Sequence, residues 1–212
     1  MAQRTIHYLF GEMISRQIKL KDKQRFLLGS ILPDAIDRSY RNASHFKVKT
    51  DICKYFDFTA FRNQYFDLMR QDDLYFGYYM HLVEDAFYRT FFFNNGFTMP
   101  KTKEEVAVLH HDYNILNAYI VNKYHLRNIL EGTFSLDEEP VSQIAPFHID
   151  AFLQEMARDF TEQIEGTPVY VTVDMLDNYV KTYLPLAIEE AKNIQDGCPI
   201  LNAAEYCWPA KR

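Results

Sequence analysis

The chain has 212 residues, of which 48% are hydrophobic and 25% charged, and its formal net charge is −6 at pH 7. This composition is ordinary for one globular domain with a sizeable core, and the acidic balance argues against a nucleic-acid-binding footprint. With only 7 glycines, the chain favours helices over a turn-rich β fold. We expect no signal peptide, and no apolar run reaches the roughly 18 residues of a membrane span. The scattered cysteines lack CxxC spacing, which indicates reduced thiols in a cytoplasmic protein.

Apolar periodicity and capping residues predict a succession of helices. Thr102 and Glu105 form a capping-box pattern, and Asp174 is an expected N-cap. The run 169–173 is strand-like, but no other expected strand is available to pair with it in a sheet. The tail from residue 197 is expected to be irregular. In chain order, the expected helices cover about residues 5–18, 57–69, 74–94, 102–124, 148–164 and 175–194, with a short apolar segment over 26–32. The sequence therefore predicts an all-α, single-domain bundle of about six to eight helices over residues 1–212.

The expected helix over 74–94 is apolar almost all round, which is typical of a central helix. His81 and Asp85 interrupt it four residues apart, so they point to the same face and can chelate one ion. Gly77 lies one turn earlier on that stripe and would let another element approach closely. A buried hydrogen bond between His81 and Asp85, or a pair between Asp85 and Arg89, is the simpler interpretation of this spacing taken alone.

Three further elements precede this helix. His7 lies on the first expected helix, Asp34 follows Pro33 after a short apolar segment, and His45 stands in a polar loop. Each alone has an ordinary explanation: an exposed histidine near the N-terminus, a turn or cap aspartate, and a loop histidine. Only their order along the chain makes them informative.

Taken together, these motifs resemble the zinc-dependent phospholipase C family, which includes the amino-terminal domain of the glycosylphosphatidylinositol-specific phospholipase D. The resemblance covers roughly the first 90 residues, with a looser echo near His111-Asp112-Tyr113. The matching residues are Thr5-Ile6-His7, Gly29-Ser30-Ile31-Leu32-Pro33-Asp34, Ser44-His45-Phe46 and Phe76-Gly77-Tyr78-Tyr79-Met80-His81-Leu82-Val83-Glu84-Asp85.

The resemblance implies an all-α bundle with metal ions at one end. It implies that His45, His81 and Asp85 hold one zinc, with Asp34 at or beside it. Asp85 would bridge to a second ion that His7 also binds. Such a pair of ions suits cleavage of a phosphodiester, because it activates a water and neutralises phosphate charge. Asp34 could instead act as the general base on that water.

The sequence departs from the family pattern in three ways. Six residues precede His7, whereas the secreted enzymes use their mature N-terminal residue as a ligand. Arg89 lies where those enzymes carry a further histidine for a third zinc, and their later HxxxE pair is not reproduced. His111 or Asp112 could complete the second site, or the pair His110-His111 could simply be exposed. Arg89 could hold a substrate phosphate or turn to solvent and pair with an acidic neighbour.

These observations predict a metal-dependent hydrolase with one or two Zn²⁺ ions, or other divalent transition metals. The expected substrate is a small phosphodiester or a lipid headgroup, and no nucleic-acid partner is expected. Two alternatives stay open: a nuclease-like phosphodiesterase, and a non-enzymatic metal-binding helical protein. The expected ligands are His7, Asp34, His45, His81, Asp85, His111 and Asp112, and the expected catalytic residues are Asp34 and Arg89.

Overall fold

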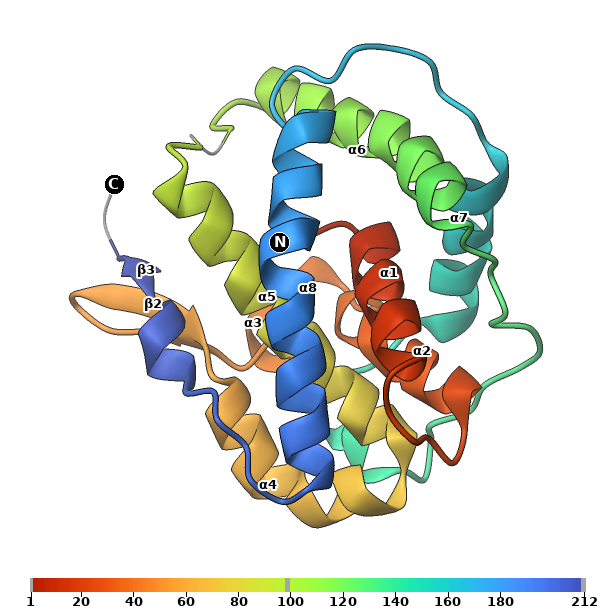
Figure 1. The fold of residues 1–212 in the computed structure, drawn as a ribbon, viewed down its shortest axis with the longest axis vertical. Coiled ribbons are helices and arrows are strands. Elements are labelled where there is room, and N and C mark those ends of the chain that lie inside the picture. The colour runs from red at the N-terminus through yellow and green to blue at the C-terminus, as the bar shows by residue number, and fades with distance from the viewer. Residues whose placement is uncertain (1, 98–99, 211–212) are drawn as a thin grey trace.

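The computed structural model describes residues 2–97 and 100–210. This part of the chain forms eight α-helices around one core, with a small sheet at one edge (Figure 1). The helices are α1 (Arg4–Ser15), α2 (Lys23–Ile31), α3 (Arg41–Ser44), α4 (Phe58–Gln71), α5 (Asp73–Asn94), α6 (Lys103–Tyr124), α7 (Ile149–Thr161) and α8 (Val173–Gln195). The predicted all-α bundle is therefore confirmed.

Capping side chains set several of the helix starts. The capping box of Thr102 and Glu105 opens α6 as predicted. The short segment expected over 26–32 is a longer helix, because Asp22 accepts a hydrogen bond from the third backbone N–H of α2. Thr172, and not Asp174, caps α8, while Asp174 lies in its first turn, where a negative charge is favourable.

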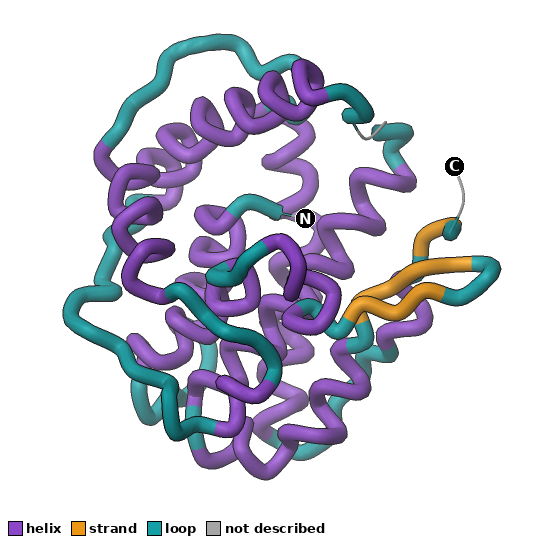
Figure 2. Tube along the Cα trace, turned by 180° about the vertical axis from the view of Figure 1, so that it is seen from behind, coloured by secondary structure: helices purple, strands orange, loops and turns teal. Residues whose placement is uncertain are grey.

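Three short strands lie where the sequence predicted none, and the last of them lies in the tail that was expected to be irregular. They are β1 (Lys47–Lys49), β2 (Cys53–Phe56) and β3 (Trp208–Pro209), paired antiparallel in the order β1-β2-β3. The run 169–173, which resembled a strand in sequence, is not one. Figure 2 shows the sheet at one edge of the helical body, near the C-terminus. Strands this short carry too few residues for an alternating pattern to be visible.

Helix α5 is the centre of the bundle, as predicted from its apolar character, and 17 of its residues are buried. Its closest neighbour is α2. A Cβ atom at Gly77 would lie 2.0 Å from the carbonyl oxygen of Phe26, and one at Gly29 would lie 2.0 Å from that of Leu74. The two helices therefore touch backbone to backbone through reciprocal glycines. The close approach predicted at Gly77 is confirmed.

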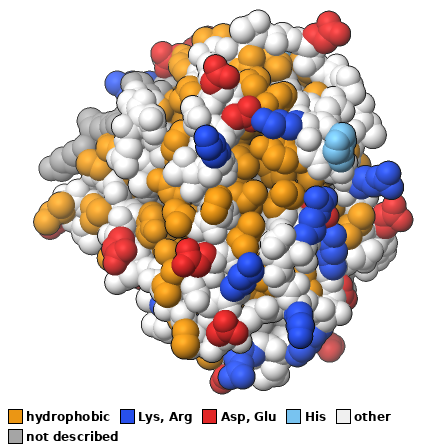
Figure 3. All heavy atoms as spheres, in the orientation of Figure 1, with side chains coloured by type: hydrophobic (Ala, Val, Ile, Leu, Met, Phe, Trp, Pro, Cys, Tyr) orange, Lys and Arg blue, Asp and Glu red, His pale blue; other side chains and the backbone are white. Residues whose placement is uncertain are grey.

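Among the described residues, no helix is both long and apolar enough to cross a bilayer. On the face seen in Figure 3, acidic and basic side chains lie interspersed around a band of hydrophobic ones.

Candidate metal centre

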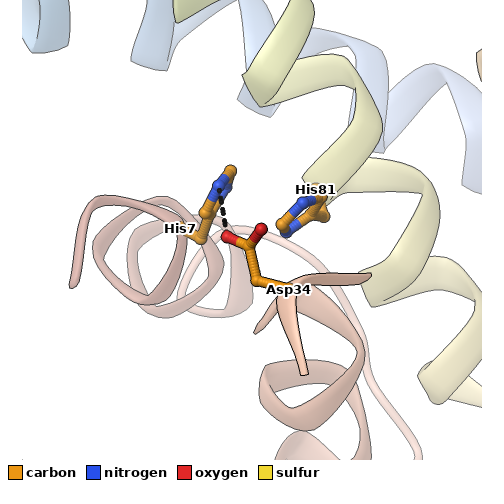
Figure 4. Close-up of side chains that lie close together, drawn as sticks. All are labelled: His7, Asp34 and His81. Atoms are coloured by element: carbon orange, nitrogen blue, oxygen red, sulfur yellow. Dashed lines mark ion pairs between the residues drawn. The ribbon is translucent and has the colours of Figure 1, made fainter. Parts of the chain in front are cut away.

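Five predicted ligands converge from distant parts of the chain. α1 carries His7, and Asp34 ends the 3-10 helix that directly follows α2. His45 is the residue after α3, and α5 contributes His81 and Asp85. Figure 4 shows His7, Asp34 and His81 pointing toward one another from these elements. The contact between α2 and α5 through Gly29 and Gly77 is what brings Asp34 against the central helix.

The ring nitrogens and carboxylate oxygens of these residues lie within a few ångströms of each other. His7 Nε2 lies 3.7 Å from Asp34 Oδ2 and 3.7 Å from Asp85 Oδ1. His45 Nε2 lies 3.3 Å from Asp34 Oδ1 and 3.5 Å from Asp85 Oδ2. The Nε2 atoms of His45 and His81 are 3.3 Å apart, and the rings of His7 and His81 stack with centroids 3.7 Å apart. Asp85 thus faces two histidines, one on each carboxylate oxygen.

Backbone carbonyls orient two of the imidazoles. His81 Nδ1 lies 2.9 Å from the carbonyl oxygen of Ser30 on α2. His45 Nδ1 lies 3.0 Å from the carbonyl oxygen of Arg41. Because a carbonyl can only accept, both Nδ1 atoms carry the proton in the neutral imidazoles, and both Nε2 atoms present lone pairs to the centre. Metal-binding histidines are commonly held in this way by an acceptor behind the ring.

The atoms at the centre of the cluster repel one another, whereas each of them would be attracted to a shared cation. Two Nε2 lone pairs at 3.3 Å repel unless a proton or a metal ion lies between them. Asp85 Oδ2 and His7 Nε2 are buried without a hydrogen-bond partner in the described part of the chain. A buried carboxylate of this kind is costly unless it is paired or bound to a metal. The donor set of imidazole nitrogens and carboxylate oxygens is the set that zinc and related ions prefer.

The same arrangement shifts the pKa values of the cluster. Burial disfavours charge on His7, but Glu84 and the neighbouring carboxylates overcome this effect and raise its pKa from 6.5 to about 9. Burial and the charge of His7 lower the pKa of His81 well below 6.5. Burial opposes ionisation of Asp34, but the three histidines, His45 foremost, hold its pKa well below the usual range. Without a metal ion, the cluster therefore keeps one proton on His7.

Sequence reasoning assigned no role to Glu84, although this residue is buried beside Asp85. Its carboxylate forms a close ion pair with His7 Nδ1 and accepts a hydrogen bond from the Tyr179 hydroxyl. It therefore orients His7 as the two carbonyls orient His45 and His81. The available signal was an acidic residue in an otherwise apolar helix, next to a predicted ligand.

The structure does not bring His111 and Asp112 into the cluster. His111 is exposed on α6. Asp112 is buried, and its carboxylate accepts backbone N–H groups of Val169, Tyr170 and Val171. Neither belongs to the groups of described residues that lie close enough to share an ion. Asp112 fixes the segment before α8, and no ligand role is proposed for either residue.

Arg89 lies one turn beyond Asp85 on α5 and faces a cavity of about 280 Å³. Its guanidinium carbon stands 5.3 Å from the centre of the Trp208 ring, a cation–π distance. Arg89 therefore lies beside the sheet at the edge of the bundle, on the wall of this cavity.

Comparisons of the chain with protein-family models, with curated proteins and with solved structures gave no match. What the centre does is therefore inferred from its own geometry and from the resemblance of its motifs.

Proposed function

We propose that this protein is a metal-dependent, phospholipase C-like hydrolase of phosphodiesters. One or two zinc ions would bind in the cluster of His7, Asp34, His45, His81 and Asp85. The observation that carries the proposal is the convergence of three buried histidines, each with its Nδ1 anchored and its Nε2 turned toward shared carboxylates. A purely structural hydrogen-bond network would also satisfy His7 Nε2, which has no hydrogen-bond partner among the described residues.

In this proposal, His45, His81 and Asp85 would hold one ion, and Asp85 and His7 would contribute to holding a second. Bound ions of this kind supply an activated water and positive charge for the phosphate. Glu84 keeps His7 oriented. Asp34 is the most exposed of the five residues, with 12% of its side chain accessible to solvent. We therefore call the side of the cluster at Asp34 its entrance. There its carboxylate can bind an ion or accept a proton from the attacking water.

Arg41 supports a role for this entrance in binding an anion. Its guanidinium lies 3.3 Å from Asp34 Oδ1, and its side chain is 47% exposed. A small phosphodiester or a lipid headgroup that enters beside Asp34 would therefore meet a cation first. We also propose a reducing, cytoplasmic location, which the free thiols of Cys53, Cys198 and Cys207 support.

A metal centre without catalysis is the second candidate, favoured by one observation. The three histidines and Asp85 are each at most 1% exposed, and structural metal sites are closed whereas catalytic sites keep an open position. Under this alternative, the ions would stabilise the junction of α1, α2 and α5.

Hydrolysis of bis(p-nitrophenyl) phosphate separates the two candidates. We expect slow turnover with added zinc, manganese or cobalt, its loss with a chelator, and weaker turnover of the monoester. His81→Ala should abolish it, while the matched variant His110→Ala, on the exposed surface of α6, should retain it. Metal binding without any turnover would support the structural centre and contradict the hydrolase.

A further inference from the structure

The cavity beside the metal centre has a wall of positive charge and aromatic rings. Its volume is about 280 Å³, close to the lower end of small-molecule sites. Residues of α5, α6 and the small sheet line it, and it is open to solvent on one side. The lining residues that matter to its chemistry are Lys47, Lys54, Tyr88, Arg89, Tyr113 and Trp208.

The register of the sheet explains why these side chains share one face. Lys54 pairs with Trp208, and Lys47 pairs with Phe56. Directly paired residues of antiparallel strands project to the same side. The rings of Phe56 and Trp208 accordingly contact each other, with centroids 4.9 Å apart. The same ladder also places Lys49 opposite Lys54, a pairing of like charges that costs stability.

The positive charges of this wall lie close together in a chain whose net charge is −6. Burial and the charges of Arg89, Lys54 and Arg41 lower the pKa of Lys47. Within the described residues, neither Lys47 nor Lys54 forms an ion pair. Two lysines that lie on one wall without a counter-ion among the described residues cost stability, and such a pair is typical of a surface that attracts an anion.

The cavity adjoins the metal centre. Tyr88 and Arg89 lie about one helical turn after Asp85 on α5, and the hydroxyls of Tyr88 and Tyr113 are 3.4 Å apart. Asp85 is also among the charges that act on both Lys47 and Tyr113. The cavity therefore begins one helical turn along α5 from Asp85, and none of the five residues of the cluster is among its described lining residues.

We propose that this cavity binds a small anion with a planar ring, of the aryl phosphate type, with its charge on Lys47 and Lys54 and its ring against Trp208 and Tyr88. Aromatic walls recognise a flat ring, and clustered cations recognise phosphate. A quaternary ammonium headgroup would be repelled by the same cations. If the proposed hydrolase function holds, the substrate is a phosphodiester with an aromatic group and a further negative charge. This part of the inference rests on the proposed function. Binding to the cavity itself requires no metal.

The single tryptophan of the chain, Trp208, makes occupancy of the cavity directly measurable. Phenyl phosphate is titrated into full-length protein freed of metal with a chelator, and the emission of Trp208 is followed. We expect a saturable change in emission that weakens with added salt. Benzyl alcohol has the ring without the charge, inorganic phosphate has the charge without the ring, and phosphocholine has the opposite headgroup. Each should bind at least about tenfold more weakly, which corresponds to the loss of one good contact.

Substitutions test whether Lys47 and Lys54 bind the anion. The double variant Lys47→Ala/Lys54→Ala should raise the dissociation constant for phenyl phosphate by about tenfold or more, and the matching double arginine variant should preserve binding. Lys123→Ala is the matched control, because Lys123 pairs with Asp177 on the surface between α6 and α8. The lysines of the wall are exposed or half-buried in short strands, so far-UV circular dichroism should confirm that the variants fold.

The results separate this proposal from the hydrolase. Unchanged binding in the double alanine variant, equal binding of benzyl alcohol, or no binding by metal-free protein would overturn the cavity proposal. Binding of phenyl phosphate by a protein that takes up no metal would support the cavity and refute the metal-dependent hydrolase.

Discussion

Two fully buried aspartates occupy comparable places on long helices and meet opposite surroundings. Asp112 on α6 accepts backbone N–H groups from residues 169–171, so its negative charge is satisfied by donors of the fold. Asp85 on α5 accepts one backbone N–H, from Ala2, on Oδ1, and its Oδ2 has no hydrogen bond among the described residues. Apart from that N–H, Asp85 faces the Nε2 atoms of His7, at 3.7 Å, and of His45, at 3.5 Å.

The difference indicates how a structural carboxylate can be told from a ligand. A carboxylate surrounded by amide hydrogens has its hydrogen-bonding capacity satisfied by the fold itself. A carboxylate that faces imidazole lone pairs needs a bound proton or metal ion to compensate its buried negative charge. Burial alone does not distinguish the two residues, because both are 0% exposed. Changes at the two aspartates, and at the residues that support them, should therefore have different consequences.

The largest effect is expected from His81→Ala. It removes one ligand of the proposed centre, so bound metal should fall from about one or two equivalents to nearly none. A ligand at a thousand times its dissociation constant stabilises the native state by about 4 kcal/mol, so we expect a melting temperature lower by on the order of 10 °C. Metal analysis after dialysis, together with thermal unfolding, measures both. Equal metal in the variant and the wild type would remove His81 from the centre.

Gly77→Ala should be nearly as damaging, although Gly77 is not a ligand. The added Cβ would lie 2.0 Å from the Phe26 carbonyl oxygen, so α2 and α5 must separate at a cost of about 1–3 kcal/mol or more. Separation also withdraws the Ser30 carbonyl from His81, and loss of such a partner typically weakens metal binding by about 10–100-fold. Urea unfolding and zinc titration test the two parts.

The matched control for this prediction is Gly166→Ala. Its new Cβ would lie 2.8 Å from the end of the flexible Ile115 side chain and in ordinary contact with His111, and none of its nearest neighbours is a backbone atom. Metal affinity should be unchanged in this variant. A Gly77→Ala protein with wild-type affinity would show that the contact between the helices does not position the centre.

The pH dependence of the metal-free protein should come from His7. Its pKa is about 9 in the folded chain and 6.5 ordinarily, so the folded state binds the proton more tightly. The resulting stabilisation is complete below pH 6.5 and is lost as the pH rises through 9, by up to roughly 3 kcal/mol. Metal takes the place of that proton, so its affinity should rise over the same interval.

Thermal unfolding at pH 6.5 and 9, with and without a chelator, tests this prediction. We expect the metal-free protein to lose stability at pH 9 and the metal-loaded protein to lose less. In His7→Gln the difference between the two pH values should shrink. A metal-free wild type that gains stability over this range would contradict the assignment of the proton to His7.

The smallest effects are expected around α6. Asp112→Asn leaves N–H groups of residues 169–171 without a charged acceptor, which should cost about 1–3 kcal/mol. The exposed His111→Ala should change stability by less than about 0.5 kcal/mol. Bound metal should stay at the wild-type level in both variants. Loss of metal in Asp112→Asn, at unchanged secondary structure, would make Asp112 a ligand after all.

The sequence predicted the seven longer helices well because each has an extended apolar pattern. It missed α3, because four residues are too few for such a pattern. It missed the sheet, since strands such as Trp208–Pro209 are too short for a pattern and pair across more than 150 residues of chain. It placed α8 at the wrong cap because Thr172 and Asp174 are both good capping residues, and only the local backbone decides between them.

At the candidate centre, the sequence indicated the residues that have short motifs around them: His7, Asp34, His45, His81 and Asp85. It could not indicate the carbonyl of Ser30, because any residue type offers a carbonyl and only the helix contact selects this one. Glu84 was missed for a related reason: its partner His7 is 77 positions away, and their contact depends on how α1 packs against α5. Tertiary contacts decide these supporting groups.

Anomalous scattering at the zinc edge, from crystals of protein grown with zinc, tests the central claim most directly. We expect one peak among His45, His81 and Asp85, and a second, where two ions bind, between Asp85 and His7. No third peak is expected beside Arg89. A map with no peak in this cluster, or with its only peaks elsewhere on the protein, would contradict the account of these residues as a metal centre.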